Sequence, residues 1–127
     1  MATIEGNCRE VCEATEFVAI VTMGDEGTHV VGNWGDYLRQ LGVGTDTILL
    51  PAGHYHQTER NLRKNERVQL LVASKAVRGT RGPGQGYLIS GRGEIVATGV
   101  AADTVRAKFP WARGALLIHV DEVRSQL

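Results

Sequence analysis

The residues best suited to chemistry cluster at one predicted junction between a strand and a helix. A short apolar run ends at residues 51–53, and a polar helix is predicted to begin near Gln57 and Thr58. Such a junction gathers backbone N–H groups, a hydroxyl and the positive end of a helix, with Arg60 and Arg63 on the first turns. This combination suits the binding of a phosphate monoester. The alternative is that Thr58 only caps the helix.

Other residues whose side chains could bind a metal, take part in redox chemistry or bind phosphate have simpler explanations. His54 and His56 have the spacing of one side of a strand, but a metal site needs further ligands, so we interpret them as ordinary polar residues. Cys8 and Cys12 are four residues apart and lack partners for a redox or metal site. The glycine-rich residues 82–86 precede a predicted strand and lack the lysine of a phosphate loop, so they predict a hairpin loop.

The charges cancel overall, at 14 basic and 14 acidic residues, but they are unevenly distributed. Residues 1–56 hold two basic and eight acidic side chains, a net charge of −6. Residues 57–92 hold eight basic and two acidic side chains, a net charge of +6. The basic middle either binds an anion or pairs with the acidic N-terminal half.

Composition is typical of one globular domain, which we expect to span residues 1–127. Hydrophobic residues make up 43% of the chain and charged residues 22%, which excludes a mainly disordered protein. The longest apolar run, residues 17–21, is too short to cross a bilayer, and the acidic N-terminus does not resemble a signal peptide. We therefore expect a cytoplasmic protein that does not bind membranes.

Local patterns predict a mainly β protein with two or three short helices, arranged as a small antiparallel barrel. Apolar runs on both sides of turn residues 24–27 predict a hairpin over residues 16–34, and residues 36–41 read as a continuation of its second strand. Residues 79–86 predict an exposed loop. Further strands are predicted at 47–50, 68–73, 87–98 and 115–120, and helices at 4–14, 56–65 and 101–109.

Specific residues also follow one another in a recognisable order over residues 16–127. They include Val18-Ala19-Ile20, Trp34 with Tyr37-Leu38, Pro51-Ala52-Gly53, His56-Gln57-Thr58-Glu59, Asn65-Glu66-Arg67-Val68, residues 81–86 and Phe109-Pro110-Trp111-Ala112-Arg113. In this order the chain resembles the FMN-binding split barrels, the pyridoxamine 5'-phosphate oxidase-like family, and within it the small FMN-binding proteins of sulfate-reducing bacteria. The resemblance implies a six-stranded antiparallel Greek-key split barrel and a homodimer with one FMN per subunit at the interface.

The resemblance also implies ten cofactor-binding residues. Those expected to contact the phosphate and the ribityl chain are Asn33, Trp34, Gln57 and Thr58. Those expected to offer backbone groups to the polar edge of the flavin ring are Leu50, Pro51, Ala52 and Gly53. Those expected to reach the flavin of the neighbouring subunit are Trp111 and Leu127.

Two of these positions depart from the family pattern. The relatives carry threonine where Asn33 stands and lysine where Gln57 stands, so one phosphate contact loses its positive charge. A charge-assisted hydrogen bond is roughly twice as strong as a neutral one, so we predict that a nearby cation compensates. The candidates are Arg60, Arg63, Lys75, Arg78 and Arg81.

Three functions are consistent with the sequence. We expect an FMN protein that carries electrons to and from an unidentified partner, because the sequence shows no general acid or base poised for a substrate. The alternative is a flavin reductase or an oxidase of a phosphorylated B6-type amine. A deazaflavin or haem could replace FMN, because related barrels hold each. A nucleic-acid-binding barrel ranks last, because Tyr87 is the only aromatic residue between Gln57 and Arg92.

Overall fold

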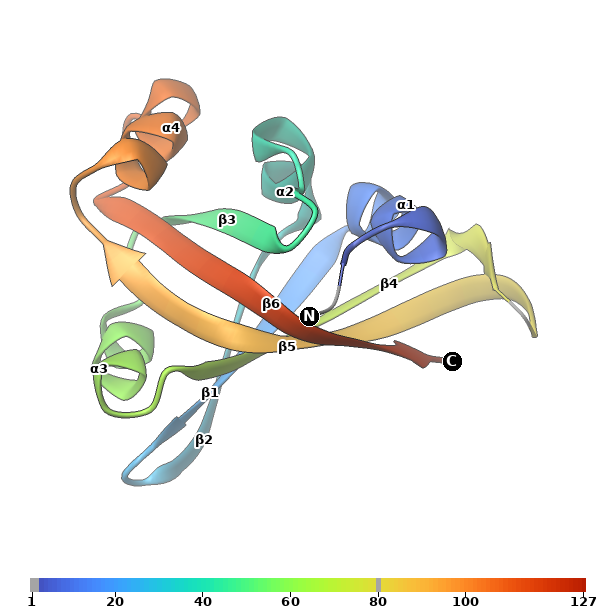
Figure 1. Ribbon diagram of the computed structural model, residues 1–127, viewed down its shortest axis with the longest axis horizontal. Coiled ribbons are helices and arrows are strands. Elements are labelled where there is room, and N and C mark those ends of the chain that lie inside the picture. Colours follow the sequence, from blue (N-terminus) through green and yellow to red (C-terminus); the bar gives the residue numbers. More distant parts are fainter. Residues whose placement is uncertain (1–2, 80) are drawn as a thin grey trace.

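In the computed structural model, which describes residues 3–79 and 81–127, six antiparallel strands form one sheet curled into a half-barrel (Figure 1). The strand order is β2-β1-β4-β5-β6-β3. The strands are β1 (Phe17–Gly24), β2 (Gly27–Trp34), β3 (Thr47–Ala52), β4 (Arg67–Gly79), β5 (Gly82–Val96) and β6 (Gly114–Gln126). The helices are α1 (Gly6–Ala14), α2 (Gly35–Leu41), α3 (His56–Lys64) and α4 (Val100–Lys108). This confirms the predicted split barrel, with four helices in place of two or three.

The inner face of the sheet carries the main core. Along β1, Val18, Ile20 and Thr22 are buried, while Phe17 and Met23 on the other face are exposed. This alternation follows from the two-residue period of a strand that buries one face. The core also takes in Cys8 and Cys12 of α1, both of them buried free thiols.

Several predicted elements are confirmed. The hairpin β1–β2 pairs Phe17 with Trp34 at one end and Gly24 with Gly27 at the other. The helix predicted at residues 4–14 is α1, and the helix predicted at residues 101–109 is α4, which ends just before Phe109. Pro51 does not end its strand as expected but lies within β3, which is an edge strand where a missing N–H donor is tolerated.

The expected strand at residues 36–41 is wrong, because this segment is helix α2. Asp36 lies in its first turn, Arg39 lies in its last turn, and Gly42 ends it with a φ of 80°. Gln40 Nε2 also donates to Asp36 Oδ2 at 2.7 Å across one turn. These are start, stop and i,i+4 signals of a helix, and they outweigh the expectation that the second strand of the hairpin continues through this segment.

The expected exposed loop at residues 79–86 is also wrong for most of its length. Residues 82–86 belong to β5, and within them Gln85 and Gly86 are buried. Gly79 pairs with Gly82, so β4 and β5 form a long hairpin that projects beyond the rest of the sheet (Figure 1). A register shift between Ser74 and Arg78 accommodates the irregular composition of this end.

The outer face of the sheet carries an exposed apolar patch. Phe17 pairs with Trp34, Val21 with Val30 and Ala19 with Leu71, so these positions lie on the same face. The side chains of Phe17, Val30, Trp34 and Leu71 are 42–59% exposed. We call these four residues the outer apolar patch. Separately, none of the helices in the described part of the chain has both the length and the apolar character that crossing a membrane requires.

Candidate functional site

A cavity of about 200 Å³ forms where the end of β2, the end of β3 and the segments before α3 and β6 meet. Five of the ten residues assigned from the sequence line it. They are Asn33, Trp34, Pro51, Gly53 and Trp111. The structure therefore brings together side chains that are up to 78 positions apart, from Asn33 to Trp111. We call this the β2–β3 cavity.

Aromatic rings form much of its wall. The ring centroid of Tyr37 lies 5.9 Å from that of Trp111 and 4.7 Å from that of Phe109, and all three rings are tilted against one another. A Cβ atom at Gly53 would lie 3.1 Å from the indole of Trp111, so glycine lets the indole lie close to the chain. Trp34 and Trp111 remain more than half exposed, which leaves apolar surface available for a planar ligand.

Asn33 ties three elements together. Its Nδ2 donates to the hydroxyl of Tyr55 at 2.6 Å and to the carbonyl of Pro51 at 3.4 Å, and its Oδ1 accepts from the backbone N–H of Trp34 at 2.9 Å. Both amide hydrogens are therefore engaged within the protein. The predicted role of Asn33 in binding phosphate stays a prediction, but in this geometry its side chain fixes the cavity wall.

Tyr55 was not anticipated from the sequence. It has a left-handed backbone, with φ 57° and ψ 30°, which is uncommon for a residue other than glycine and clusters at functional sites. Burial raises the pKa of Tyr55 to about 12, although the hydrogen bond from Asn33 works in the opposite direction. The phenol is therefore held neutral at the edge of the cavity.

Two arginines fix the loops around the cavity. Arg113 donates through Nε to the carbonyl of His54 at 2.8 Å and pairs through Nη1 with Glu59 Oε1 at 3.1 Å. Arg106 donates through Nε to the carbonyl of Ala112 at 3.1 Å and through Nη2 to the carbonyl of Arg113. These bonds join the loop that carries Trp111 to the start of α3.

The first turn of α3 differs from the sequence prediction in one respect. The predicted helix is confirmed, but Thr58 does not cap it, because the helix begins at His56 and Tyr55 precedes it without a side-chain capping bond. Thr58 is fully buried, and its Oγ1 has no hydrogen-bond partner among the described residues. A buried hydroxyl without a partner, beside free helix N–H groups, fits an anionic ligand at this turn.

Gln57 faces outward from the same turn. Its Nε2 donates to Asn61 Oδ1 at 2.7 Å, and its Oε1 accepts from Arg60 Nη2 at 2.7 Å. Gln57 and Arg60 line a groove of about 390 Å³ between α3 and the β1–β2 turn. Gln57 follows the cavity residues His54 and Tyr55 closely in the sequence, but the groove and the β2–β3 cavity share no lining residue. Two of the candidate cations are thus held at this turn by side-chain bonds, Arg60 by the neutral amide of Gln57 and Arg63 by the carboxylate of Glu59 at 3.1 Å.

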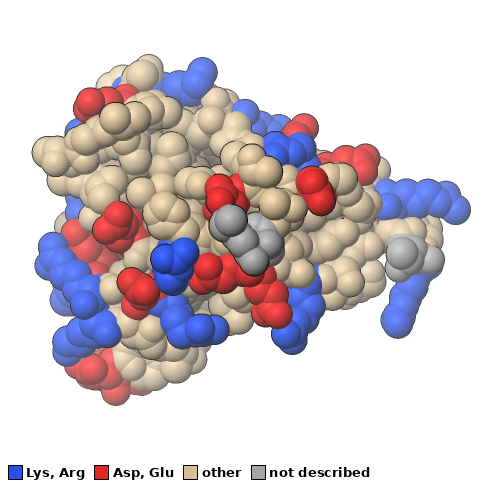
Figure 2. Space-filling model, in the orientation of Figure 1, with Lys and Arg blue, Asp and Glu red and all other residues tan. Residues whose placement is uncertain are grey.

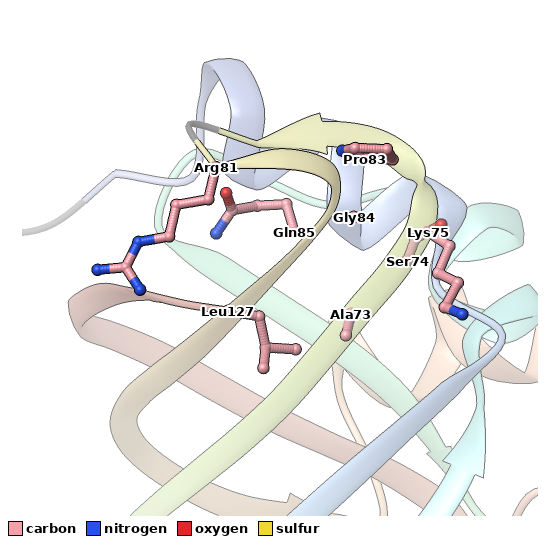
Figure 3. A pocket seen from close by; sticks show the side chains of 8 residues that line it. All are labelled: Ala73, Ser74, Lys75, Arg81, Pro83, Gly84, Gln85 and Leu127. Atoms are coloured by element: carbon pink, nitrogen blue, oxygen red, sulfur yellow. The ribbon is translucent and has the colours of Figure 1, made fainter.

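The remaining assigned residues lie elsewhere. Leu50 and Ala52 are fully buried in the sheet, so only their backbone groups could face a ligand. Leu127 lines a second cavity of about 560 Å³ beside the β4–β5 hairpin, together with Lys75, Arg81 and Gln85 (Figure 3). We call this the hairpin cavity. Arg81 and Leu127 extend on the same side of the hairpin, whereas Lys75 points away from them (Figure 3).

The uneven distribution of charge along the chain is explained only in part by ion pairs between the basic middle and the acidic N-terminal half. Lys64 pairs with Asp25, which joins the basic middle to the acidic N-terminal half. Among the described residues, the other ion pairs that include the basic middle do not involve that half; they are Arg63 with Glu59, Arg113 with Glu59 and Arg92 with Asp121. Basic and acidic side chains are interspersed at the α3 end of the face in Figure 2, and basic side chains project from the hairpin tip.

Two further residues line the cavity without a role predicted from the sequence. His54 and Tyr37 also line the β2–β3 cavity. The rings of His54 and His56 lie 6.4 Å apart, and within residues 3–79 and 81–127 no group of three His, Cys, Asp or Glu side chains is placed to hold a metal ion. The sequence around such residues does not indicate that they line a cavity, because their position there depends on contacts with strands that are distant in the chain.

Comparison with known proteins places the chain in a family. The family model described as pyridoxamine 5'-phosphate oxidase matches residues 4–126. The chain belongs to the pyridoxamine 5'-phosphate oxidase family. A protein of Nitratidesulfovibrio vulgaris (strain Miyazaki F) named FMN-binding protein is 38% identical over 124 residues, which cover 98% of this chain and 99% of that protein. The resemblance drawn from the sequence is thereby confirmed.

Solved structures of low sequence identity share the fold of this family member. The HupZ protein of Group A Streptococcus gives a TM-score of 0.74 at 15% identity, covering 97% of this chain and 99% of the other. An FAD-binding protein of Mesorhizobium loti gives a TM-score of 0.66 at 15% identity, covering 97% and 94%. At these identities the similarity establishes the split barrel and no more.

Proposed function

We propose that this protein is a homodimeric FMN-binding flavoprotein that transfers electrons. The observation that carries the proposal is the convergence of Asn33, Trp34, Pro51, Gly53 and Trp111 on one cavity beside the first turn of α3. The protein of Nitratidesulfovibrio vulgaris that is 38% identical over nearly the whole chain is named FMN-binding protein, which supports the same cofactor here.

The residues present fit a flavin nucleotide. The indole of Trp34 offers exposed aromatic surface to a planar ring bound by the same chain. The indole of Trp111 lines the same cavity and is similarly exposed, so in a dimer whose flavin lies at the interface it can meet that ring or, as the resemblance implies, the flavin of the neighbouring subunit. The backbone of β3 ends at Pro51 and Ala52 beside that surface, where it can meet the polar edge of the ring. The buried Thr58 hydroxyl and the N–H groups of the first turn of α3 suit the phosphate. The bound isoalloxazine would supply the electron chemistry, and the protein would control its access and potential.

The size of the β2–β3 cavity supports a dimer. Its volume of about 200 Å³ is below the roughly 300–1,000 Å³ that is usual for a cofactor site, so one chain encloses only part of a flavin. The outer apolar patch offers a surface that a second copy could cover. In that assembly the hairpin cavity with Leu127 would complete the site from the neighbouring subunit.

A second candidate, a flavin-dependent oxidoreductase such as a reductase or an amine oxidase, is favoured by His54. This imidazole lines the β2–β3 cavity, and histidine is the side chain most often used as a general acid or base. The electron-carrier function predicts that reduced nicotinamide leaves the flavin oxidised unless a redox partner is present. The oxidoreductase predicts turnover with reduced nicotinamide, or with oxygen and a phosphorylated B6-type amine.

The first experiment is the absorbance spectrum of the purified protein, followed by mass spectrometry of the small molecule that acid releases. We expect a yellow protein with about one FMN per chain. Sedimentation should give twice the 13.8 kDa of one chain, and Val30→Glu in the outer apolar patch should lower that mass. A colourless protein that also fails to bind added FMN would contradict the proposed function.

A further inference from the structure

Three cations lie near the first turns of α3, and their partners differ. Arg113 pairs with Glu59 Oε1 at 3.1 Å, and Arg63 pairs with Glu59 Oε2 at 3.1 Å. Arg60 contacts no carboxylate among the described residues, and instead donates through Nη2 to Gln57 Oε1 at 2.7 Å. One carboxylate therefore offsets two of these charges, while the charge of Arg60 stays available to an anion.

Gln57 is held in place by a relay that starts in the core. Thr22 and Asn61 are buried, and Asn61 Nδ2 donates to Thr22 Oγ1 at 3.0 Å. Asn61 Oδ1 then accepts from Gln57 Nε2 at 2.7 Å, which turns Gln57 Oε1 toward Arg60. A Cβ atom at Gly24 would lie 2.4 Å from Asn61 Oδ1, so glycine makes room for the relay. The relay orients the guanidinium from the interior of the barrel.

The surroundings of Arg60 set the local charge. The groove that Arg60 lines also contains Asp25 and Glu26 of the β1–β2 turn and Lys64 of α3. Lys64 pairs with Asp25, which leaves Glu26 as the acidic group that faces the groove without an ion pair among the described residues. The guanidinium of Arg60 is held back toward the start of the helix, where N–H groups also favour an anion.

We propose that Arg60 binds the phosphate of the flavin nucleotide at the start of α3, and that Gln57 is the positioning residue that orients Arg60. This inference rests on the proposed function. Both amide hydrogens of Asn33 are engaged by Tyr55 and Pro51, so Asn33 has no free donor for the phosphate, whereas Arg60 has no carboxylate partner among the described residues. A guanidinium supplies both charge and a forked pair of N–H donors for phosphate oxygens.

The test compares FMN with riboflavin, which lacks the phosphate, by quenching of flavin fluorescence on the full chain freed of bound flavin. Arg60→Gln should weaken FMN binding about tenfold or more and leave riboflavin binding unchanged, because only the contact with phosphate is lost. The matched control is Arg63→Gln, which removes the same charge from the next turn of the helix and should change neither affinity. Melting temperatures of all variants report whether folding is preserved.

Two further variants separate a phosphate contact from a structural role. Arg60→Lys should retain part of the preference for FMN, because it keeps the charge without the fork. Adding Gln57→Lys to Arg60→Gln should restore the preference, because it returns a cation to the same turn. Gln57→Ala should lower FMN affinity less than Arg60→Gln does, and again leave riboflavin binding unchanged.

The outcomes distinguish this inference from the proposed function. A wild-type protein that binds neither flavin refutes both. If the wild type prefers FMN to riboflavin and Arg60→Gln keeps the same preference, the proposed role of Arg60 is wrong, but the proposed flavoprotein function stands. Loss of the preference in Arg81→Gln instead would place the phosphate-binding cation at the hairpin cavity, and equal wild-type affinity for the two flavins would remove phosphate recognition altogether.

Discussion

The β2–β3 cavity and the hairpin cavity differ in how firmly their walls are fixed. The β2–β3 cavity is the smaller, at about 200 Å³, and its wall residues are bonded to strands, a helix and two loops. The hairpin cavity is larger, at about 560 Å³, but it lies on a projecting hairpin and the last residue of the chain. Convergent polar groups and rings, rather than volume, mark the site that can orient a ligand.

This difference suggests separate roles for the two cavities in binding the flavin. The β2–β3 cavity would hold and orient the flavin, because Asn33, Tyr55 and Arg113 link its walls. The hairpin cavity would cover the flavin of a neighbouring copy, because Leu127 is 82% exposed and open to a partner. Substitutions at the first cavity should therefore affect stability and affinity, whereas those at the second should affect solvent access.

The largest effect is expected for Asn33→Ala. This substitution removes the hydrogen bonds that link β2 to Pro51 of β3 and to Tyr55, and it should lower the free energy of unfolding by about 2 kcal/mol. Denaturant unfolding measures the change. The matched substitution at the hairpin cavity, Ser74→Ala, removes one exposed bond to the N–H of Ala76 and should cost under about 0.5 kcal/mol. Equal losses at the two sites would remove the proposed difference between the cavities.

Tyr55 should make stability depend on alkaline pH. Because its pKa is about 12 in the folded chain against an ordinary value of 10, the folded state keeps a proton that the unfolded chain loses. The stabilisation is complete below pH 10 and is lost as the pH rises toward 12, by about 2 kcal/mol. Unfolding free energies of the wild type and Tyr55→Phe should therefore converge over this interval. A constant difference between them would show that Tyr55 ionises equally in both states.

Particular residues show what could be predicted from the sequence. The β1–β2 hairpin was predictable because alternation and the turn at residues 24–27 are local signals. Helix α2 was missed because seven residues leave little periodicity, and residues 82–86 were misread because glycine and proline usually mark loops. Each error came from a local pattern that tertiary pairing overrode.

The candidate site was predictable in part for a similar reason. The resemblance supplied Trp34, Gly53 and Trp111, which the structure brings to one cavity. It could not supply Tyr55, whose left-handed backbone and bond to Asn33 depend on the packing of β2 against the segment before α3. The resemblance also could not single out Arg60 among the five candidate cations. That selection depends on the ion pairs that Arg63 and Arg113 form with Glu59, which only the structure shows.

A smaller effect is expected for Trp111→Ala. The indole lies against Gly53 at the wall of the β2–β3 cavity, and loss of a stacked ring should weaken FMN binding by about 1 kcal/mol, or roughly fivefold. Titration of FMN into the flavin-free protein measures the affinity. Trp111→Phe is the control, since it keeps an aromatic face and should retain most of the affinity. An unchanged affinity in Trp111→Ala would place the flavin ring away from this wall.

The smallest effect is expected for removal of Leu127. The backbone carbonyl of Gln126 would still accept from Gln85 Nε2 at 2.9 Å, so the free energy of unfolding should change by less than about 0.5 kcal/mol. Because Leu127 lines the cavity expected to cover the partner's flavin, iodide should quench the bound flavin more efficiently, and the reduction potential should shift. Leu127→Met, which keeps an apolar side chain, is the control. Quenching that stays the same after the truncation would show that another group shields the ring, and that the hairpin cavity takes no part in the flavin site.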